Sequence, residues 1–114
     1  MKLLNTKWQI LRKRSIAPNI KEMDVYAPKI AKVAKPGQFV IVMVDEYGER
    51  IPLTLVDWNG SEGWIRIVFA EVGVSTMKLG SLDLGKSIYY VLGPLGVPTH
   101  IDKFGTVVVV GGGV

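Results

Sequence analysis

Residues 50–54, with the sequence Arg-Ile-Pro-Leu-Thr, place three chemically different side chains at alternate positions. Alternate side chains of a strand project to opposite faces, so Arg50, Pro52 and Thr54 are expected on one face and the aliphatic residues between them on a buried face. A guanidinium, a rigid ring and a hydroxyl in a row suit a ligand with an anionic part and a flat polar part. The proline also favours an edge or a bulge, where backbone without a strand partner could bind that ligand. An ordinary strand with an exposed arginine and an edge proline is the alternative interpretation.

Gly73, Ser75 and Thr76 form a second candidate element, because they stand just before apolar residues at helical spacing in 77–82. We expect a short helix there, with Ser75 or Thr76 as its N-cap. The free N–H groups of a helix start and a nearby hydroxyl bind anions, and glycine lets the backbone come close to a ligand. Arg50 could add a guanidinium fork that matches phosphate oxygens. A dinucleotide, with a pyrophosphate and a flat ring, would use all of these groups.

The composition limits what else the chain can bind. Its 114 residues are enough for one domain with a single core, and 48% of them are hydrophobic and 21% charged, as in a globular protein. There is no cysteine, which excludes a disulfide and a thiolate-bound metal or iron–sulfur cluster within this chain. His100 is the only histidine, so we expect no metal site. No apolar stretch is long enough for a signal peptide or a membrane span, which predicts a cytoplasmic protein without a membrane partner.

The densest positive charge is the run Arg12, Lys13 and Arg14, in a chain with a net charge of +4. Such a run is usually the solvated side of a strand. It can also form a patch that binds nucleic acid, although no row of aromatic residues accompanies it, as a protein that binds single strands would have. A non-enzymatic small barrel that binds nucleic acid or a partner protein through this basic strand is therefore the alternative function.

Alternating and β-branched segments between glycine and proline turns predict an all-β fold. Their hairpin spacing, with one short helix near residue 75, indicates a six-stranded antiparallel Greek-key barrel with one short capping helix. The spacing of Ile30 and Val33 allows a further short turn of helix. The predicted strands are 8–16, 19–26, 38–44, 50–58, 64–70 and 87–92, and residues 93–96 are expected to open a loop.

The last residues differ from the rest of the chain. Residues 106–110 are a threonine followed by four valines, and three glycines follow at 111–113. An uninterrupted apolar run predicts a strand buried on both faces, and glycines after such a strand are typical of a dinucleotide-binding βα turn. We therefore expect a barrel domain at 1–104 and, at 105–114, the start of a truncated NAD(P)-binding domain. Without neighbouring strands, the valines favour pairing with a second copy of the chain in a weak homodimer.

Four motifs in this order resemble the flavin-binding domain of the ferredoxin–NADP reductase superfamily. They are Arg-Ile-Pro-Leu-Thr at 50–54, Gly-Val-Ser-Thr at 73–76, Gly-Pro-Leu-Gly at 93–96, and the valine strand that runs into glycines. Within the superfamily the sequence is similar to the flavin subunit of NADH-dependent ferredoxin:NADP oxidoreductase (sulfide dehydrogenase type) and to the electron-transfer subunit of dihydroorotate dehydrogenase. The resemblance implies a barrel that binds FAD.

The resemblance also implies a role for each motif residue. Arg50 would contact the FAD phosphates. Pro52, Leu53 and Thr54 would line the isoalloxazine, and Thr54 would be the catalytic residue, as the group nearest to the flavin N5. The other implied cofactor contacts are Ile67, Val68 and Phe69 beside the ribityl and adenine portions, Gly73, Ser75 and Thr76 at the pyrophosphate, and Gly93, Pro94, Leu95 and Gly96 near the flavin and the junction with a nicotinamide domain.

The function that the resemblance implies belongs to a longer parent protein. There the flavin would exchange electrons with NAD(P)H and pass them to an iron–sulfur centre, so NAD(P) and a [2Fe–2S] cluster are expected only in the full-length parent. A catalytic large subunit, ferredoxin or both are the implied partners. We expect an oxidoreductase by family, and a fragment that is inactive by itself.

Overall fold

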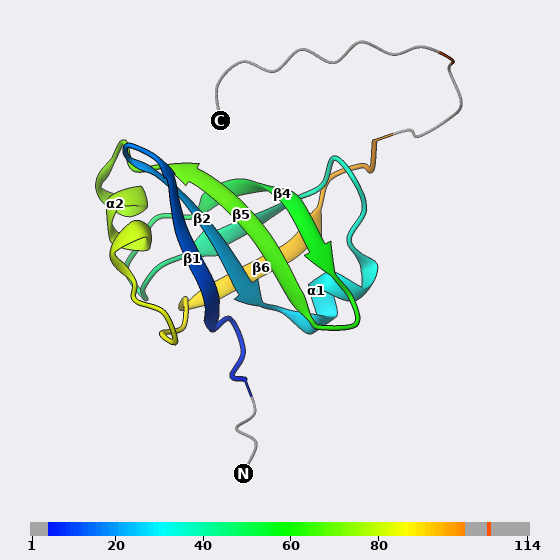
Figure 1. Cartoon of the computed structure of the whole chain (residues 1–114), viewed down its shortest axis with the longest axis horizontal. Coiled ribbons are helices and arrows are strands. Elements are labelled where there is room, and N and C mark those ends of the chain that lie inside the picture. Colours follow the sequence, from blue (N-terminus) through cyan, green and yellow to red (C-terminus); the bar gives the residue numbers. More distant parts are fainter. Residues whose placement is uncertain (1–4, 100–104, 106–114) are drawn as a thin grey trace.

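The computed structural model describes residues 5–99 and residue 105, and the strands and helices within 5–99 form one barrel (Figure 1). The strands follow the predicted order, with ends that differ from the prediction by three residues or fewer. The predicted strand at 106–110 lies outside the described residues. The strands are β1 (Ile10–Ala17), β2 (Ile20–Tyr26), β3 (Phe39–Met43), β4 (Ile51–Asn59), β5 (Trp64–Ala70) and β6 (Tyr90–Leu95), and the helices are α1 (Pro28–Val33) and α2 (Val74–Ser81).

The strands pair antiparallel in the order β1-β2-β5-β4-β3-β6. Because β2 lies next to β5 and β3 next to β6, the chain crosses between non-consecutive strands in the Greek-key manner. The segment just before β6 closes the ring against the start of β1. Gln9 bridges to Ser87 there, and the Ile88 N–H donates to the Trp8 carbonyl at 2.9 Å. The predicted Greek-key barrel is confirmed.

The core lies inside the barrel because the strands turn alternate aliphatic residues inward. Met23 and Val25 on β2, and Val40 and Val42 on β3, have no solvent-exposed surface. Their spacing of two residues is the period at which a strand returns to the same face. Full burial of one such side chain contributes roughly 1.5–3 kcal/mol to folding.

The two short helices lie on opposite sides of the barrel (Figure 1). The sequence predicted one capping helix, α2, and allowed a helical turn where α1 forms a complete second helix. α1 begins at Pro28, whose fixed backbone angle suits the first position of a helix, and it buries Ile30 and Ala31. α2 buries Leu79 completely. Neither helix is long and apolar enough to cross a membrane.

The N-cap of α2 is Gly73, so the prediction of Ser75 or Thr76 at this position was wrong. Gly73 has an extended backbone, and the Thr76 hydroxyl reaches back to accept its N–H at 3.0 Å. The same hydroxyl accepts the N–H of Val72 at 3.1 Å. Thr76 therefore holds the helix start from within the first turn, because a threonine three residues after the cap can satisfy a free donor there.

β6 extends to Leu95, so the predicted loop at 93–96 begins only at Gly96. Residues 93–95 stay in the strand despite their glycine and proline, because β6 pairs with β3 through an irregular register near Phe39. Gly93 allows this pairing, since a Cβ at its position would lie 2.8 Å from Cγ1 of Val40 and 3.3 Å from the Phe39 carbonyl oxygen.

Candidate functional site

The first half of β4 has one exposed and one buried face, as the alternation of its residues predicted. Pro52 and Thr54 are exposed, Leu55 is buried, and Leu53 packs partly against the core. Thr54 lies opposite Phe39 of β3 in the ladder. The exposed face therefore combines a hydroxyl and a proline ring on a firmly anchored strand.

The first half of β4 has a strand partner on one side only. β3 pairs with residues 51–54, whereas β5 pairs with β4 only from Leu55 to Asn59. Within the part of the chain that the structure describes, the second edge of 51–54 has no strand ladder. Pro52 predicted such an edge, because a proline in a doubly paired strand would remove a ladder hydrogen bond. The backbone of this segment is therefore open to a ligand.

The start of α2 lies beside the start of β4. The hydroxyl of Ser75, which is 8% exposed, donates to Oε1 of Glu49 at 2.7 Å. A second contact joins the same two regions, since Lys78 Nζ lies 3.3 Å from Oδ2 of Asp45. The structure thus brings together the two elements that the sequence singled out, with Arg50 directly after Glu49.

Arg50 borders an open hollow of about 520 Å³ on the outer side of β3 and β6. It is exposed, and none of the ion pairs among the described residues includes it. Tyr89 and Tyr90 line the same hollow and are 51% and 41% exposed. The sequence analysis did not include these tyrosines among the site residues. Strand alternation through Leu92 could have placed Tyr90 on the outer face, but only the β3–β6 pairing brings it toward Arg50.

The remaining predicted site residues differ in how exposed they are and in how far they lie from β4. Ile67 and Phe69 are 1% and 2% exposed, so their side chains belong to the core and only their backbone could meet a ligand. Val68, between them, is partly exposed. The segment Gly93 to Leu95 lies in β6, which is separated from β4 by β3. Gly96 follows it, and the Gly96 carbonyl accepts a hydrogen bond from Gln38 Nε2 at 3.1 Å.

A second charged cluster surrounds Asp24, which is 2% exposed on β2. Arg66 donates from Nε to Oδ1 at 2.7 Å and from a terminal nitrogen to Oδ2 at 3.1 Å, and Arg12 also donates to Oδ2. Burial alone would raise the pKa of Asp24, but the hydrogen bonds and charges of the two arginines outweigh it and hold this pKa below its usual value. The ring of Trp64 lies 4.9 Å from the Arg66 guanidinium and 5.0 Å from that of Arg12.

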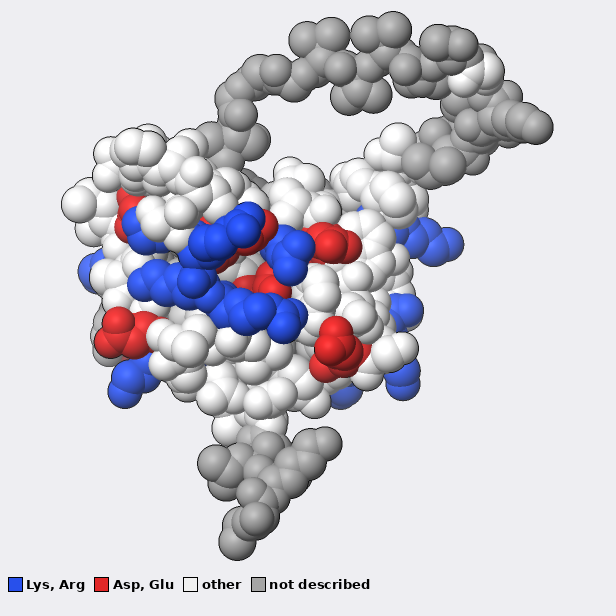
Figure 2. All heavy atoms as spheres, viewed as in Figure 1, with Lys and Arg blue, Asp and Glu red and all other residues white. Residues whose placement is uncertain are grey.

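The basic strand is largely neutralised by its neighbours. Figure 2 shows Lys and Arg side chains gathered on one face of the barrel, with acidic side chains between them. A surface that binds nucleic acid needs cations free to meet phosphates. Within the run, Arg12 pairs with Asp24, Arg14 Nε lies 3.2 Å from Glu22 Oε2, and Lys13 Nζ donates to the Leu82 carbonyl at 2.9 Å. This pairing argues against the nucleic-acid alternative.

Asp24→Asn is expected to lower the free energy of unfolding at neutral pH by roughly 1 kcal/mol, because the arginine ends of the two lost pairs are partly exposed. The depressed pKa fixes the sign of the pH dependence. The carboxylate's contribution is complete above the ordinary pKa of 3.8 and is lost as the pH falls through the lower folded-state value. Urea unfolding of both proteins, at neutral pH and in acid, should show a difference that shrinks in acid.

The control for this experiment is Asp83→Asn, at an exposed position, which should leave stability nearly unchanged at both pH values. A difference between the wild type and Asp24→Asn that stays constant in acid would contradict the assignment of the effect to the Asp24 carboxylate.

A closed Greek-key barrel that sets an exposed arginine and an open strand edge beside a helix start has the architecture of an FAD-binding domain of the ferredoxin–NADP reductase superfamily. The chain is 42% identical over 106 residues to the dihydroorotate dehydrogenase B (NAD(+)) electron transfer subunit homolog of Thermotoga maritima, a match that covers 93% of the chain and 38% of that protein. It is 31% identical over 111 residues to the dihydroorotate dehydrogenase B (NAD(+)) electron transfer subunit of Geobacillus thermodenitrificans, covering 92% of the chain and 43% of that protein.

Among solved structures, an NADH-dependent reduced ferredoxin-NADP oxidoreductase, described for flavin-based electron bifurcation, matches with a TM-score of 0.86 and 38% identity, over 88% of this chain and 36% of the other. No protein-family model matches the sequence. The chain belongs to the ferredoxin–NADP reductase superfamily as a barrel domain of the FAD-binding type, and the predicted family is confirmed. It spans 38% and 43% of the length of the two curated relatives.

Proposed function

We propose that the chain binds FAD on the exposed face of β4 and at the start of α2, as the FAD-binding domain of an NAD(P)H-dependent electron-transfer oxidoreductase. The observation that carries this proposal is the hydrogen bond from Ser75 to Glu49, because it holds the helix start beside Arg50. Arg50 follows Glu49 directly in the chain, and the helix start offers free N–H groups, so a pyrophosphate that spans the two would meet a cation and several donors. The two matched relatives are named electron transfer subunits, and these names support the redox assignment.

The residues present fit this cofactor. Apart from its own chain neighbours and the backbone of α2, no heavy atom of the described residues lies within 4 Å of the position that a Cβ on Gly73 would occupy, so a phosphate can approach the backbone closely. Arg50 is exposed and has no ion-pair partner among the described residues that would compete with a phosphate. The exposed Pro52 and Thr54 beside the open edge of β4 leave room for a flat ring with polar edges.

Each group has a distinct task in this proposal. Arg50 and the 73–76 segment hold the phosphates, while 52–54 supports the isoalloxazine, and Thr54 offers its hydroxyl or N–H to the N5 edge. Val68, with the backbone on either side of it, borders the ribityl and adenine portions, and 93–96 lies toward the neighbouring domain. When bound, FAD supplies hydride and single-electron chemistry, and the barrel supplies binding, orientation and hydrogen bonds.

The wider electron-transfer role concerns a longer parent protein. We propose residues 1–104 as the FAD domain and 105–114 as the start of an NAD(P)-binding domain, with NAD(P) and a [2Fe–2S] cluster held by other parts of the parent. A catalytic large subunit or ferredoxin would then receive or supply the electrons. The chain alone would bind flavin without oxidising NAD(P)H at an enzymatic rate. The homodimer through 106–110 stays a proposal, because these residues lie outside the described ones.

Titration of the chain with flavins tests the proposed function. We expect FAD to bind about ten-fold or more tightly than riboflavin, because charge-assisted hydrogen bonds to the pyrophosphate contribute roughly 1.5–3 kcal/mol. FMN, with one phosphate, should bind with intermediate affinity. Quenching of flavin fluorescence measures all three. Absence of binding would overturn the proposal, and equal affinity for FAD and riboflavin would remove the pyrophosphate site from it.

Glu49→Gln is expected to tighten FAD binding by roughly two- to five-fold, the range of one exposed charge–charge contact. The Glu49 carboxylate accepts the Ser75 hydroxyl at the position where the pyrophosphate is proposed, so two anions would compete for the helix start. Glutamine keeps an acceptor for Ser75 and removes the charge. The control is Glu62→Gln, in the turn between β4 and β5, which should change nothing. Weaker binding by Glu49→Gln would mean that the carboxylate assists the cofactor instead of competing with it.

A further inference from the structure

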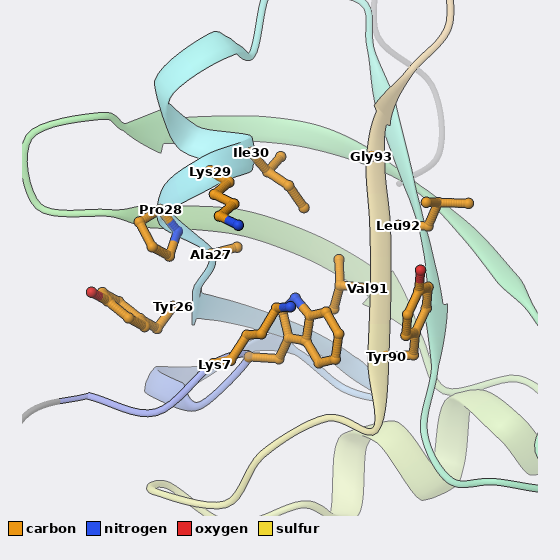
Figure 3. Close-up of a pocket in the computed structure, with 11 residues that line it drawn as sticks. Lys7, Tyr26, Ala27, Pro28, Lys29, Ile30, Tyr90, Val91, Leu92 and Gly93 are labelled. Carbon is orange, nitrogen blue, oxygen red and sulfur yellow. The ribbon is translucent and has the colours of Figure 1, made fainter.

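A second hollow, of about 350 Å³, lies where the barrel wall opens beside β6 (Figure 3). The backbone hydrogen bonds that close the barrel join the start of β1 to the segment before β6. The last of them runs from the Ile88 N–H to the Trp8 carbonyl. The Trp8 N–H then turns away to the Tyr26 carbonyl at 2.8 Å, so β6 continues without a partner on this side among the described residues. The N-terminal arm, α1 and β6 form the walls of the hollow.

The walls of this hollow are mainly apolar and aromatic. Trp8 contributes apolar surface from the N-terminal arm, Pro28 and Ile30 from α1, and Val91 from β6. The ring of Trp8 packs edge-on against that of Tyr90, with centroids 5.0 Å apart and planes at 61°. A bound ring would therefore meet a wall whose orientation is already fixed, which reduces the entropy lost on binding.

The charges of the hollow have one sign. Among the residues that the structure describes, Lys7 and Lys29 are the only charged ones that line it, and no carboxylate does. Lys7 Nζ lies 4.5 Å from the centre of the Trp8 ring, and Lys29 is exposed with no ion-pair partner among the described residues. Figure 3 shows Lys29 reaching in from α1 and Lys7 from the N-terminal arm, on different walls of the same space.

We propose that this hollow binds a small aromatic molecule that carries one carboxylate. The apolar walls take the ring, and the ammonium groups of Lys7 and Lys29 take the charge. The volume of the hollow lies within the range of ordinary small-molecule sites. Arg50 and α2 do not line it, but Tyr90 and Leu92 border both hollows and Gly93 belongs to the 93–96 segment, so the test is made on the flavin-free chain.

The test is a nuclear magnetic resonance titration of the 15N-labelled, flavin-free chain with 2-naphthoate and with its neutral analogue, 2-naphthamide. Saturable amide shifts confined to 7–8, 26–30 and 90–93, together with the Trp8 indole N–H, are the expected result for naphthoate. Naphthamide should bind the same place more weakly. Equal affinity for both probes, shifts elsewhere on the barrel, or no saturable shift at millimolar naphthoate would each overturn the proposal.

Paired lysine variants separate this site from general attraction by a basic protein. Lys7→Gln with Lys29→Gln should weaken naphthoate binding by about five- to ten-fold, as expected for the loss of two partly exposed ion pairs, and leave naphthamide binding unchanged. The matched control, Lys32→Gln with Lys35→Gln, removes the same charge from exposed positions that do not line the hollow. An equal loss of naphthoate affinity in both double variants would overturn the proposal. The unperturbed remainder of each spectrum shows that the variant is folded.

Discussion

Arg50→Ala is expected to weaken FAD binding about ten-fold or more while the barrel stays folded. The side chain is exposed and makes no ion pair with the described residues, so its removal leaves neither a cavity nor a buried unpaired group. A guanidinium bound to a phosphate forms charge-assisted hydrogen bonds worth roughly 1.5–3 kcal/mol, and this is the contribution that the variant loses. Flavin titration gives the affinity, and urea unfolding gives the stability.

Two further variants test whether Arg50 acts through the planar shape of its guanidinium and through its position on the barrel. Arg50→Lys keeps the charge but loses the planar fork, so its FAD affinity should fall between those of the wild type and Arg50→Ala. Arg14→Ala removes an arginine on β1, three strands away from β4 in the sheet order. The side chain of Arg14 is 71% exposed and pairs with Glu22, so its removal should leave FAD affinity unchanged. If Arg50→Ala binds FAD as well as the wild type does, Arg50 does not belong to the site.

The strands could be predicted because their residues alternate with the period of a strand and their turns carry glycine or proline. β5 shows this most clearly, since Trp64–Ala70 was predicted to the residue. The alternation of β4 likewise predicted an exposed Pro52 and Thr54 and a buried Leu55. The same rule, applied to β5, indicates that Ile67 and Phe69 share a buried face. Because both side chains are buried, the cofactor contacts that the resemblance implied for these two residues remain a prediction about their backbone.

The parts that could not be predicted depend on contacts between distant segments. The Gly-Pro-Leu-Gly sequence at 93–96 carries strong turn signals, but pairing with β3 keeps most of it in a strand. The hydrogen bond between Glu49 and Ser75 joins segments 26 residues apart, and no local pattern encodes it. The prediction that the elements around Arg50 and α2 bind one ligand had only two sources, the chemistry of their side chains and the family resemblance. The position of Tyr89 and Tyr90 beside Arg50 likewise depends on the pairing of β6 with β3.

Leu79→Ala is expected to lower the free energy of unfolding by about 2–5 kcal/mol, the cost of deleting a large buried aliphatic side chain and leaving a cavity. Leu79 has no exposed surface and belongs to the core cluster, so it fastens α2 to the barrel. α2 is only eight residues long, and a helix of this length is not stable in water without such packing. The packing of Leu79 therefore also fixes the 73–76 segment at which the pyrophosphate is proposed to bind.

Met77→Ala is the matched control, because Met77 lies on the same helix and is 59% exposed. It should change the free energy of unfolding by no more than about 0.5 kcal/mol, as surface substitutions usually do. Urea unfolding of the two variants measures the difference between a buried and an exposed position of α2. FAD titration at a urea concentration where both remain folded then shows whether Leu79→Ala also loosens the helix start, which should appear as weaker FAD binding in this variant alone. Equal stability losses in the two variants would show that α2 is not held by Leu79.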